Sequence, residues 1–475
     1  MKQILSVGID IGTSTTQVIF SQISMENTSG YFTVPKISIV GKDIVYKGDI
    51  HRTPLRTSSL IDGEAVRSIV SAEFQKAGYA PKDTDTGAVI ITGESARKEN
   101  SEEVLRYLSD FAGEFVVSTA GPDIESVVAG KGSGAAAYSE EYGVAVVNLD
   151  IGGGTTNAAI FDDGEVCATG CLDIGGRLIT MDSAGKITYV SESAKQVAAY
   201  AGVTVQVGDT ANEESLRKIC DGYAAVLEQF LGLTPPTALL QALKTPGSSD
   251  FRLHPKLRAV CFSGGVADFV YGAERDPFHF GDIGVLLGQA IRRSKLCSAF
   301  KVIGASETIR ATVVGAGTYT TSVSGSTIDY SDGLFPLKNI PVLKLNAQQQ
   351  AACFAGDSAV LTETFRWFLR QNDCRNAVIA MDGDPNPSYM AVQRLAKCIA
   401  QTADAVLPPS EPVMIVLRHD MAKVLGRQIR AVLGDGRPVI SIDSVVVQQN
   451  DYIDMGRPLM EGMVIPVVVK TLIFG

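Results

Sequence analysis

Two short stretches of the chain repeat one acidic, glycine-rich pattern. The first is Asp10-Ile-Gly-Thr-Ser-Thr-Thr16 and the second is Asp150-Ile-Gly-Gly-Gly-Thr-Thr156, and five of their seven positions are identical. Glycine lets successive backbone amides converge on phosphate oxygens, and Thr and Ser hydroxyls add donors. An aspartate beside a phosphate requires a bridging cation, and Mg²⁺ with its retained waters is suited to that role. The pattern therefore predicts two turns that hold one polyphosphate and Mg²⁺ between them.

Apolar runs flank both stretches and indicate the elements that would position them. Ile4–Ile9 and Val144–Leu149 precede the two turns, and Val18–Phe20 and Ala158–Phe161 follow them. Each copy therefore predicts a strand, a tight turn and a second strand, which together form a β-hairpin. Ordinary hairpins that merely need Gly and Thr are the alternative, because short glycine motifs recur by chance. The repeat, with its aspartate retained, favours the paired phosphate site.

The overall composition excludes several classes of function. The chain has 475 residues, which predicts about three domains, and 45% of its residues are hydrophobic. A net charge of −10 disfavours nucleic acid and anionic membranes as partners. The eight cysteines form no CxxC pair, which disfavours a metal or iron–sulfur site. The sequence shows neither a signal peptide nor an apolar run near the ~20 residues of a membrane helix. We therefore expect a cytoplasmic protein.

Elements of one kind follow each hairpin in the same order. In the first half we expect a third strand at Phe32–Ile39, a loop or edge strand over 41–61, and then the helix Asp62–Ala77. The strand Ala88–Thr92, a helix opening at Gly93–Arg97 and the strand Phe115–Ser118 should follow. A stretch of small residues over 120–138 ends this half. In the second half we expect the strand Glu165–Ile174 and then a polar region, 178–255, with one clear helix, Glu213–Leu231. The strand Arg258–Ser263 and the helix Asp282–Arg293 should follow. A stretch of small residues over 310–321 comes next, and Ser326–Tyr330 closes the unit.

This shared order predicts an internal duplication. The expected units are two mixed-sheet α/β lobes, residues 1–140 and 141–335, with a cleft between them. The paired glycines Gly264 and Gly265, after an apolar strand, would let a flat ring approach the backbone. Residues 336–475 alternate strands with helices, which predicts a partly parallel sheet. We expect a binding or packing role for this third domain, since it shows no catalytic constellation.

These motifs resemble those of the actin, heat-shock-protein-70 and sugar-kinase ATPases. The two repeated stretches are similar to the phosphate motifs of that superfamily, and Phe262-Ser-Gly-Gly-Val-Ala267 is similar to its adenosine motif. The stretches at 120–138 and 310–321 resemble its two connecting helices. The resemblance implies an α/β fold of duplicated actin-like, ribonuclease H-like ATPase lobes with a central cleft, plus the smaller C-terminal α/β domain.

A closer resemblance, over essentially the whole chain, is to the reactivating factors of ethanolamine ammonia-lyase. It rests on phrases such as Ile90-Ile-Thr-Gly-Glu-Ser-Ala96, Phe280-Gly-Asp-Ile-Gly284 and Asp451-Tyr-Ile-Asp-Met-Gly-Arg-Pro-Leu459. It implies a weak ATPase that serves as a chaperone in ethanolamine utilization. With ATP and Mg²⁺ it would loosen both subunits of the lyase, so that damaged cobalamin leaves and intact adenosylcobalamin enters. The factor would meet cobalamin only through the lyase, in the cytoplasm and in association with the bacterial microcompartment.

The resemblance also implies roles for individual residues. Asp10 and Asp150 would hold Mg²⁺ through water, and Asp150 would help orient the attacking water. Glu125, on the first connecting helix, would contact a metal-bound water, although a surface or capping glutamate is the simpler alternative. The nucleotide would be bound by Gly12, Thr13, Ser14, Thr15, Gly152, Gly153, Gly154, Thr155, Gly264 and Gly265.

Two other functions fit the same hairpins. A small-molecule kinase would need a catalytic base and an acceptor pocket in the cleft. An actin-like filament or scaffold protein would form nucleotide-dependent polymers. The chain lacks the GxxxxGK[ST] loop of P-loop ATPases.

Overall fold

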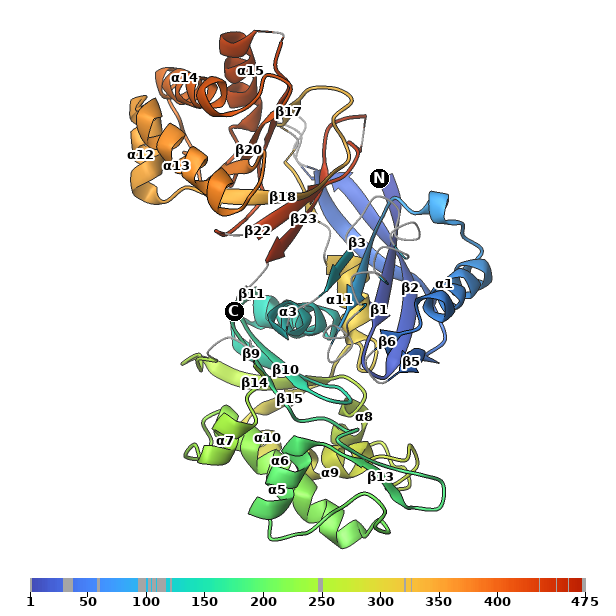
Figure 1. Cartoon of the computed structure of the whole chain (residues 1–475). Coiled ribbons are helices and arrows are strands. Elements are labelled where there is room, and N and C mark those ends of the chain that lie inside the picture. The colour runs from blue at the N-terminus through green and yellow to red at the C-terminus, as the bar shows by residue number, and fades with distance from the viewer. Residues whose placement is uncertain are drawn as a thin grey trace.

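The described part of the chain folds around three large β-sheets that follow one another along the sequence, with two further two-stranded sheets, β5-β6 and β12-β13 (Figure 1). The computed structural model describes residues 2–28, 37–57, 60–92, 100, 104, 108, 117–119, 122–246, 251–319, 322–325, 327–434, 436–449, 451–459 and 461–471. The helix expected to open at 93–97 lies outside these residues. None of the helices described is long and apolar enough to cross a membrane.

The first sheet has the strand order β3-β2-β1-β7-β8. Its first three strands are antiparallel, and the last two run parallel to β1. The strands are β1 (Lys2–Ile11), β2 (Thr15–Asn27), β3 (Ile37–Lys47), β7 (Thr86–Ile91) and β8 (Val117–Thr119). Helix α1 (Gly63–Ala77) begins at its N-cap Asp62 and ends at Gly78, as predicted. Phe74 of this helix packs edge-on against Phe20 of β2, which closes the core.

The predicted third strand, Phe32–Ile39, is tested only from Ile37 on, because residues 29–36 lie outside the described part of the chain. Strand β3 covers Ile37–Lys47, so it begins within the predicted strand and continues into 41–61, which was expected to be a loop or an edge strand. It lies at the edge of the sheet, and Val40 and Val45 are 45% and 43% exposed. An edge strand needs one partner and little apolar surface, so pairing with β2 decides its position more than its own composition does. Shorter strands follow at β4 (His51–Arg52), β5 (Leu55–Thr57) and β6 (Leu60–Ile61).

The second sheet repeats the topology of the first. Its order is β11-β10-β9-β14-β15, again with three antiparallel strands followed by two parallel ones. The strands are β9 (Ala145–Ile151), β10 (Thr156–Asp162), β11 (Glu165–Leu172), β14 (Leu257–Ser263) and β15 (Lys301–Ile303). The duplication predicted from the repeated motif is therefore a duplication of the whole sheet.

The region 178–255 contains more structure than its polar sequence indicated. The predicted helix is present as α6 (Glu213–Phe230), capped by Asn212. Around it lie the strands β12 (Ile179–Met181) and β13 (Ile187–Val190) and the helices α5 (Glu192–Tyr200) and α7 (Ala238–Ala242). These elements, with α8 (Ala267–Val270), α9 (Gly284–Arg293) and α10 (Leu296–Ala299), build the largest apolar core of the chain.

Two helices of small residues cross between the sheets (Figure 1). Helix α3 (Pro122–Gly132), with α4 (Ala135–Tyr142) after it, packs on the second sheet, and α11 (Ala311–Tyr319) packs on the first. The crossing is possible only without side chains at the contact. A Cβ on Gly132 would lie 1.9 Å from the carbonyl oxygen of Ala311, and one on Gly315 would lie 2.0 Å from that of Val128. Each half of the chain therefore supplies the helix that covers the other half's sheet.

The third sheet has eight strands in the order β16-β23-β22-β18-β19-β20-β21-β17. The bounds are β16 (Ser322–Val323), β17 (Asp329–Tyr330), β18 (Leu337–Lys344), β19 (Val378–Met381), β20 (Val413–Leu417), β21 (Val439–Ile442), β22 (Asp451–Met455) and β23 (Pro466–Thr471). Strands β18 to β21 are parallel, as the alternating pattern predicted. The helices are α12 (Ala347–Ala355), α13 (Ser358–Gln371), α14 (Tyr389–Val406) and α15 (Ala422–Leu433).

The stretch expected to close the second unit belongs instead to this third sheet. Strand β17 pairs with β21, and β16 pairs with β23. Their few residues carry no periodicity that could reveal a distant partner. The α/β class with duplicated, ribonuclease H-like sheets and a C-terminal α/β part is as predicted.

Candidate functional site

The two repeated turns adopt the same local structure. The Gly12 amide donates to the Thr15 carbonyl and the Gly152 amide donates to the Thr155 carbonyl, both at 2.9 Å. All residues of both turns, 12–15 and 152–155, are half-buried and so reachable from solvent. Each turn connects antiparallel strands whose register places its aspartate at the end of the first strand. Both stretches are hairpins, as the sequence predicted.

The turns from the two halves face each other. A Cβ placed on Gly153 would lie 2.6 Å from the Ser14 hydroxyl oxygen. The charge of Asp150 also acts on Asp10 and contributes to the raised pKa of that carboxyl. The structure thus brings together the two acidic turns that lie about 140 residues apart in the sequence.

The two aspartates are buried, and each accepts one hydroxyl hydrogen bond. Thr92 donates to Asp10 Oδ1 at 2.9 Å, and Ser263 donates to Asp150 Oδ1 at 2.6 Å. Burial raises the pKa of Asp10 to about 7, opposed by the Thr92 hydrogen bond and assisted by the charge of Asp150. Burial raises the pKa of Asp150 to about 6, opposed by the Ser263 hydrogen bond. Two buried carboxylates facing one space are costly as anions, which is the electrostatic condition that a bound cation relieves.

Two buried amide oxygens are consistent with a hydrated cation between the turns. Gln17 pairs with Asp10 across the first hairpin and Asn157 pairs with Asp150 across the second, so each amide shares a face with its aspartate. Gln17 Oε1 and Asn157 Oδ1 are buried and accept no hydrogen bond from the residues described. Buried acceptors are normally satisfied, and waters on a cation are donors that suit both amides and carboxylates. These residues therefore fit a magnesium ion that keeps its waters.

The paired glycines after β14 have different surroundings. Gly264 has φ +86°, and a Cβ on it would lie 2.3 Å from the Ile151 carbonyl oxygen, so this position requires glycine. Gly265 is exposed, and the nearest atom to its missing Cβ is Ile309 Cδ1 at 3.9 Å. Gly264 thus holds the loop against the second turn, and Gly265 leaves open space beside it.

Glu125 is buried on α3, the helix that covers the second sheet. Two residues before it, Asp123 accepts a hydrogen bond from Thr169 of β11. Burial rules out the surface alternative, and the position of Glu125 in the first turn of α3 leaves the capping alternative open. Contact with a metal-bound water stays a prediction.

Several residues around the site were missed by sequence reasoning. Gln17 and Asn157 each follow the repeated motif by one residue, so a longer alignment of the repeat could have found them. Thr92 and Ser263 lie at the carboxyl ends of equivalent parallel strands, β7 and β14, which only the topology reveals. Arg177 packs its side chain beside Gly153 and donates its amide to the Gly153 carbonyl at 2.7 Å.

A hydrogen-bond chain connects Asp150 to the end of helix α3. Asn148 donates to the Ser263 hydroxyl oxygen at 3.0 Å, and Ser133 donates to the Asn148 amide oxygen at 2.9 Å. All members of this chain are buried. Buried hydrogen bonds therefore connect Asp150 to Ser133, the residue that follows α3.

Comparisons with known proteins agree over the whole chain. The family model described as "Ethanolamine utilisation protein EutA" matches residues 2–475. The ethanolamine ammonia-lyase reactivase EutA of Salmonella typhimurium is 36% identical over 486 residues, and that of Escherichia coli K12 is 34% identical over 480 residues. Each alignment covers 100% of this chain and 99% of the relative.

Solved structures are similar to part of the chain at low sequence identity. The PPX-GPPA enzyme of Aquifex aeolicus is 15% identical with a TM-score of 0.41, over 66% of this chain and 99% of that one. The ethanolamine utilization protein EutJ from Carboxydothermus hydrogenoformans is also 15% identical, with a TM-score of 0.33 over 66% and 89% of the two chains. The full-length match to the family model and to both reactivases decides the assignment: the chain belongs to the EutA family of ethanolamine utilisation proteins.

Proposed function

We propose that this protein is an ATP-dependent reactivating factor for ethanolamine ammonia-lyase. The observation that carries the proposal is the pair of matching turns, which face each other with one buried aspartate each. Its relatives in Salmonella and Escherichia coli, both named as reactivases of this lyase, support the choice of client.

The proposed nucleotide site uses residues from both halves. The amides and hydroxyls of Gly12, Thr13, Ser14 and Thr15, and those of Gly152, Gly153, Gly154 and Thr155, would bind the β- and γ-phosphates. The open space at Gly265, with Gly264 fixing the loop, would accept the adenosine. Asp10 and Asp150 would bind the waters of Mg²⁺, joined by Gln17 and Asn157. When bound, Mg²⁺ supplies positive charge that neutralises the phosphates.

In the proposed reaction, weak ATP hydrolysis depends on positioning and charge, because phosphoryl transfer to water needs no covalent nucleophile. Asp150, held by Ser263, would orient the attacking water, and Glu125 would bind a further metal-bound water. In this proposal the protein would do no chemistry on cobalamin itself. Release of the damaged cofactor would follow from different affinities for two conformers of the lyase, set by the nucleotide state. We further propose a cytoplasmic location in association with the microcompartment.

The decisive experiment mixes the protein with lyase that has been inactivated by hydroxocobalamin. Recovered lyase activity should require added adenosylcobalamin, ATP and Mg²⁺ together. Phosphate release without a small-molecule acceptor would distinguish this function from a kinase, and the absence of nucleotide-dependent sedimentation would distinguish it from a filament protein. Failure to recover activity under any nucleotide condition would overturn the proposal.

A further inference from the structure

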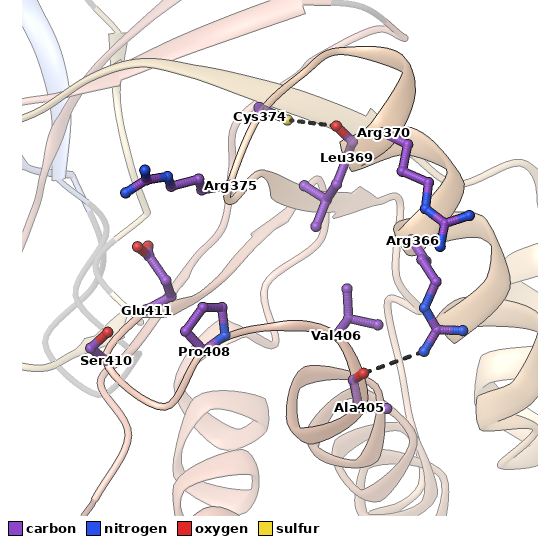
Figure 2. A pocket seen from close by; sticks show the side chains of 10 residues that line it. All are labelled: Arg366, Leu369, Arg370, Cys374, Arg375, Ala405, Val406, Pro408, Ser410 and Glu411. Carbon is purple, nitrogen blue, oxygen red and sulfur yellow. Dashed lines mark hydrogen bonds between the residues drawn. The ribbon is translucent and has the colours of Figure 1, made fainter.

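The C-terminal unit carries a cavity far from the facing turns (Figures 1 and 2). It has a volume of about 640 Å³ and lies between the last turns of α13 and α14. Leu369, Val406 and Pro408 form apolar walls, and Arg366, Arg370 and Arg375 lie around them (Figure 2). The volume is within the range of ligand pockets, roughly 300–1,000 Å³.

Arginines near helix ends are often explained by the helices themselves, because carbonyls at a C-terminus attract cations. Two arginines here have that role for α14. Arg366 donates to the Ala405 carbonyl at 3.3 Å, and Arg437 donates to the carbonyls of Leu407 and Pro408 at 3.2 Å and 3.0 Å. Asp404, the nearest acidic residue of α14, pairs with Arg437 at 3.5 Å. The end of α14 is thus already satisfied.

The end of α13 is satisfied by the chain's own backbone. The amides of Asn372, Asp373 and Cys374 donate to the carbonyls of Phe368, Arg370 and Leu369. The side chains of Arg370 and Arg375 are exposed, and neither forms a hydrogen bond or ion pair within the described part of the chain. In a protein with a net charge of −10, these two guanidinium groups therefore have no anionic partner among the described residues, although Arg370 also suits the dipole of α13.

The charges around the cavity favour an extended ligand over a compact one. Arg370 and Arg375 lie on opposite sides of the apolar walls, and Glu411 faces Arg375 on its side (Figure 2). Glu411 accepts a hydrogen bond from Asn376 at 3.2 Å, which fixes its carboxylate near the rim. A small polyanion at Arg375 would also meet this carboxylate. An extended peptide can place separate carboxylates at the two arginines and an apolar side chain between them.

We infer that this cavity is a docking site for an acidic, extended segment of another protein. The identity of that partner as ethanolamine ammonia-lyase rests on the proposed function. The separation of this cavity from the facing turns leaves nucleotide binding and lyase docking to different parts of the chain.

The test compares two charge-reversal variants of the full chain. One is Arg370→Glu with Arg375→Glu. The matched control is Lys423→Glu with Arg427→Glu, which makes the same change in net charge at exposed positions of α15. Because Glu at the end of α13 opposes the helix dipole, an Arg370→Gln, Arg375→Gln variant is measured alongside. The readouts are affinity for purified lyase, ATP turnover and unfolding temperature.

We expect the pocket reversal to weaken lyase binding by roughly tenfold or more, the Gln variant by a smaller factor, and the control hardly at all. Wild-type affinity should also fall with added salt more steeply than that of the pocket variant. ATP turnover should be unchanged in all of them. Equal lyase affinity in wild type and pocket variant would overturn this inference and leave the proposed function intact. The inference would also be overturned if inorganic phosphate bound only when Arg370 and Arg375 are present, while lyase affinity did not depend on these arginines. Absence of lyase binding by wild type would overturn both.

Discussion

The two facing turns share a hydrogen-bonding pattern but differ in what supports them. Thr53 holds the first turn, donating its hydroxyl to the Gly12 carbonyl at 2.7 Å and its amide to the Ser14 carbonyl at 3.1 Å. In the strand after this turn, Gln17 donates to the Ile309 carbonyl of the other half at 3.1 Å. The second is held by the turn at 175–177 and by the loop after β14, and its aspartate connects through Ser263 and Asn148 to helix α3. The duplicated motif has thus kept its turn hydrogen bonds while the surrounding contacts have diverged. Each hairpin therefore reaches one of the helices between the sheets by a different route, the first directly through Gln17 beside α11 and the second through Ser263 and Asn148 beside α3.

The largest difference should appear when each aspartate loses its charge. Asp10→Asn and Asp150→Asn should each reduce ATP turnover by at least about tenfold, because charge stabilisation is the main contribution to phosphoryl transfer. The loss should be greater for Asp150→Asn if it also orients water. Phosphate release measures turnover, and circular dichroism checks the fold. Wild-type turnover in either folded variant would contradict the site.

The same substitutions should stabilise the protein without nucleotide. The pKa values of about 7 for Asp10 and about 6 for Asp150 exceed the ordinary 3.8, so the folded chain holds protons that the unfolded chain releases. Stability should therefore fall as pH rises from about 4 to about 7. At pH 8, Asp10→Asn should raise the free energy of unfolding on the order of 1–3 kcal/mol, and Asp150→Asn somewhat less.

Urea titrations across this pH range measure that effect. Asp268→Asn, at an exposed position next to the glycine loop, is the matched control and should leave the pH dependence as it is. A flat pH dependence in wild type would show that the two carboxyls are not held in the uncharged form.

The distance between the turns can be tested with a single methyl group. Gly153→Ala would place Cβ 2.6 Å from Ser14 Oγ, so nucleotide affinity should fall by roughly tenfold. Removing that oxygen in Gly153→Ala, Ser14→Ala should recover part of the loss, which a double-mutant cycle measures. Strict additivity of the two substitutions would indicate that the turns do not meet in solution.

The smallest effects should come from the supporting hydroxyls. Thr92→Val and Ser263→Ala each remove a hydrogen bond that lowers an aspartate pKa, so the acidic limb of the turnover profile should move to higher pH. Turnover at pH 7 should fall about two- to fivefold. Both variants should destabilise the fold because each removes a buried hydrogen bond to an aspartate, but Ser263→Ala should cost about 1–3 kcal/mol more, since it also leaves the buried Asn148 amide without its acceptor. Equal unfolding free energies for the two variants would contradict the hydrogen-bond chain.

Much of this site could be predicted from sequence because hairpins are local. Each hairpin occurs in one uninterrupted run that contains its aspartate, Asp10 or Asp150, its glycines and its flanking strands. Because the run is repeated, the sequence also predicted that the two turns act as a pair. Helix α1 was equally predictable, since Asp62 and Gly78 are ordinary helix signals.

The missed features depend on contacts between distant segments. Thr92 and Ser263 acquire their role only when parallel strands align, and β17 only when it reaches β21. Strand β3 lies at an edge, and its sequence fitted a loop as well as an edge strand, so only its pairing with β2 decides between them. Arg370 and Arg375 look like ordinary surface cations until the hydrogen bonds at both helix ends are assigned.

The exchange of helices between the two duplicated sheets has a consequence for any attempt to divide the protein. A fragment cut after Tyr142 would retain α3 but lose the surface that α3 covers, and its own sheet would be left bare where α11 packs. The complementary fragment would show the mirror-image defect. Neither fragment should fold stably alone. Co-expressed fragments should associate, because each one carries the helix that covers the sheet of the other.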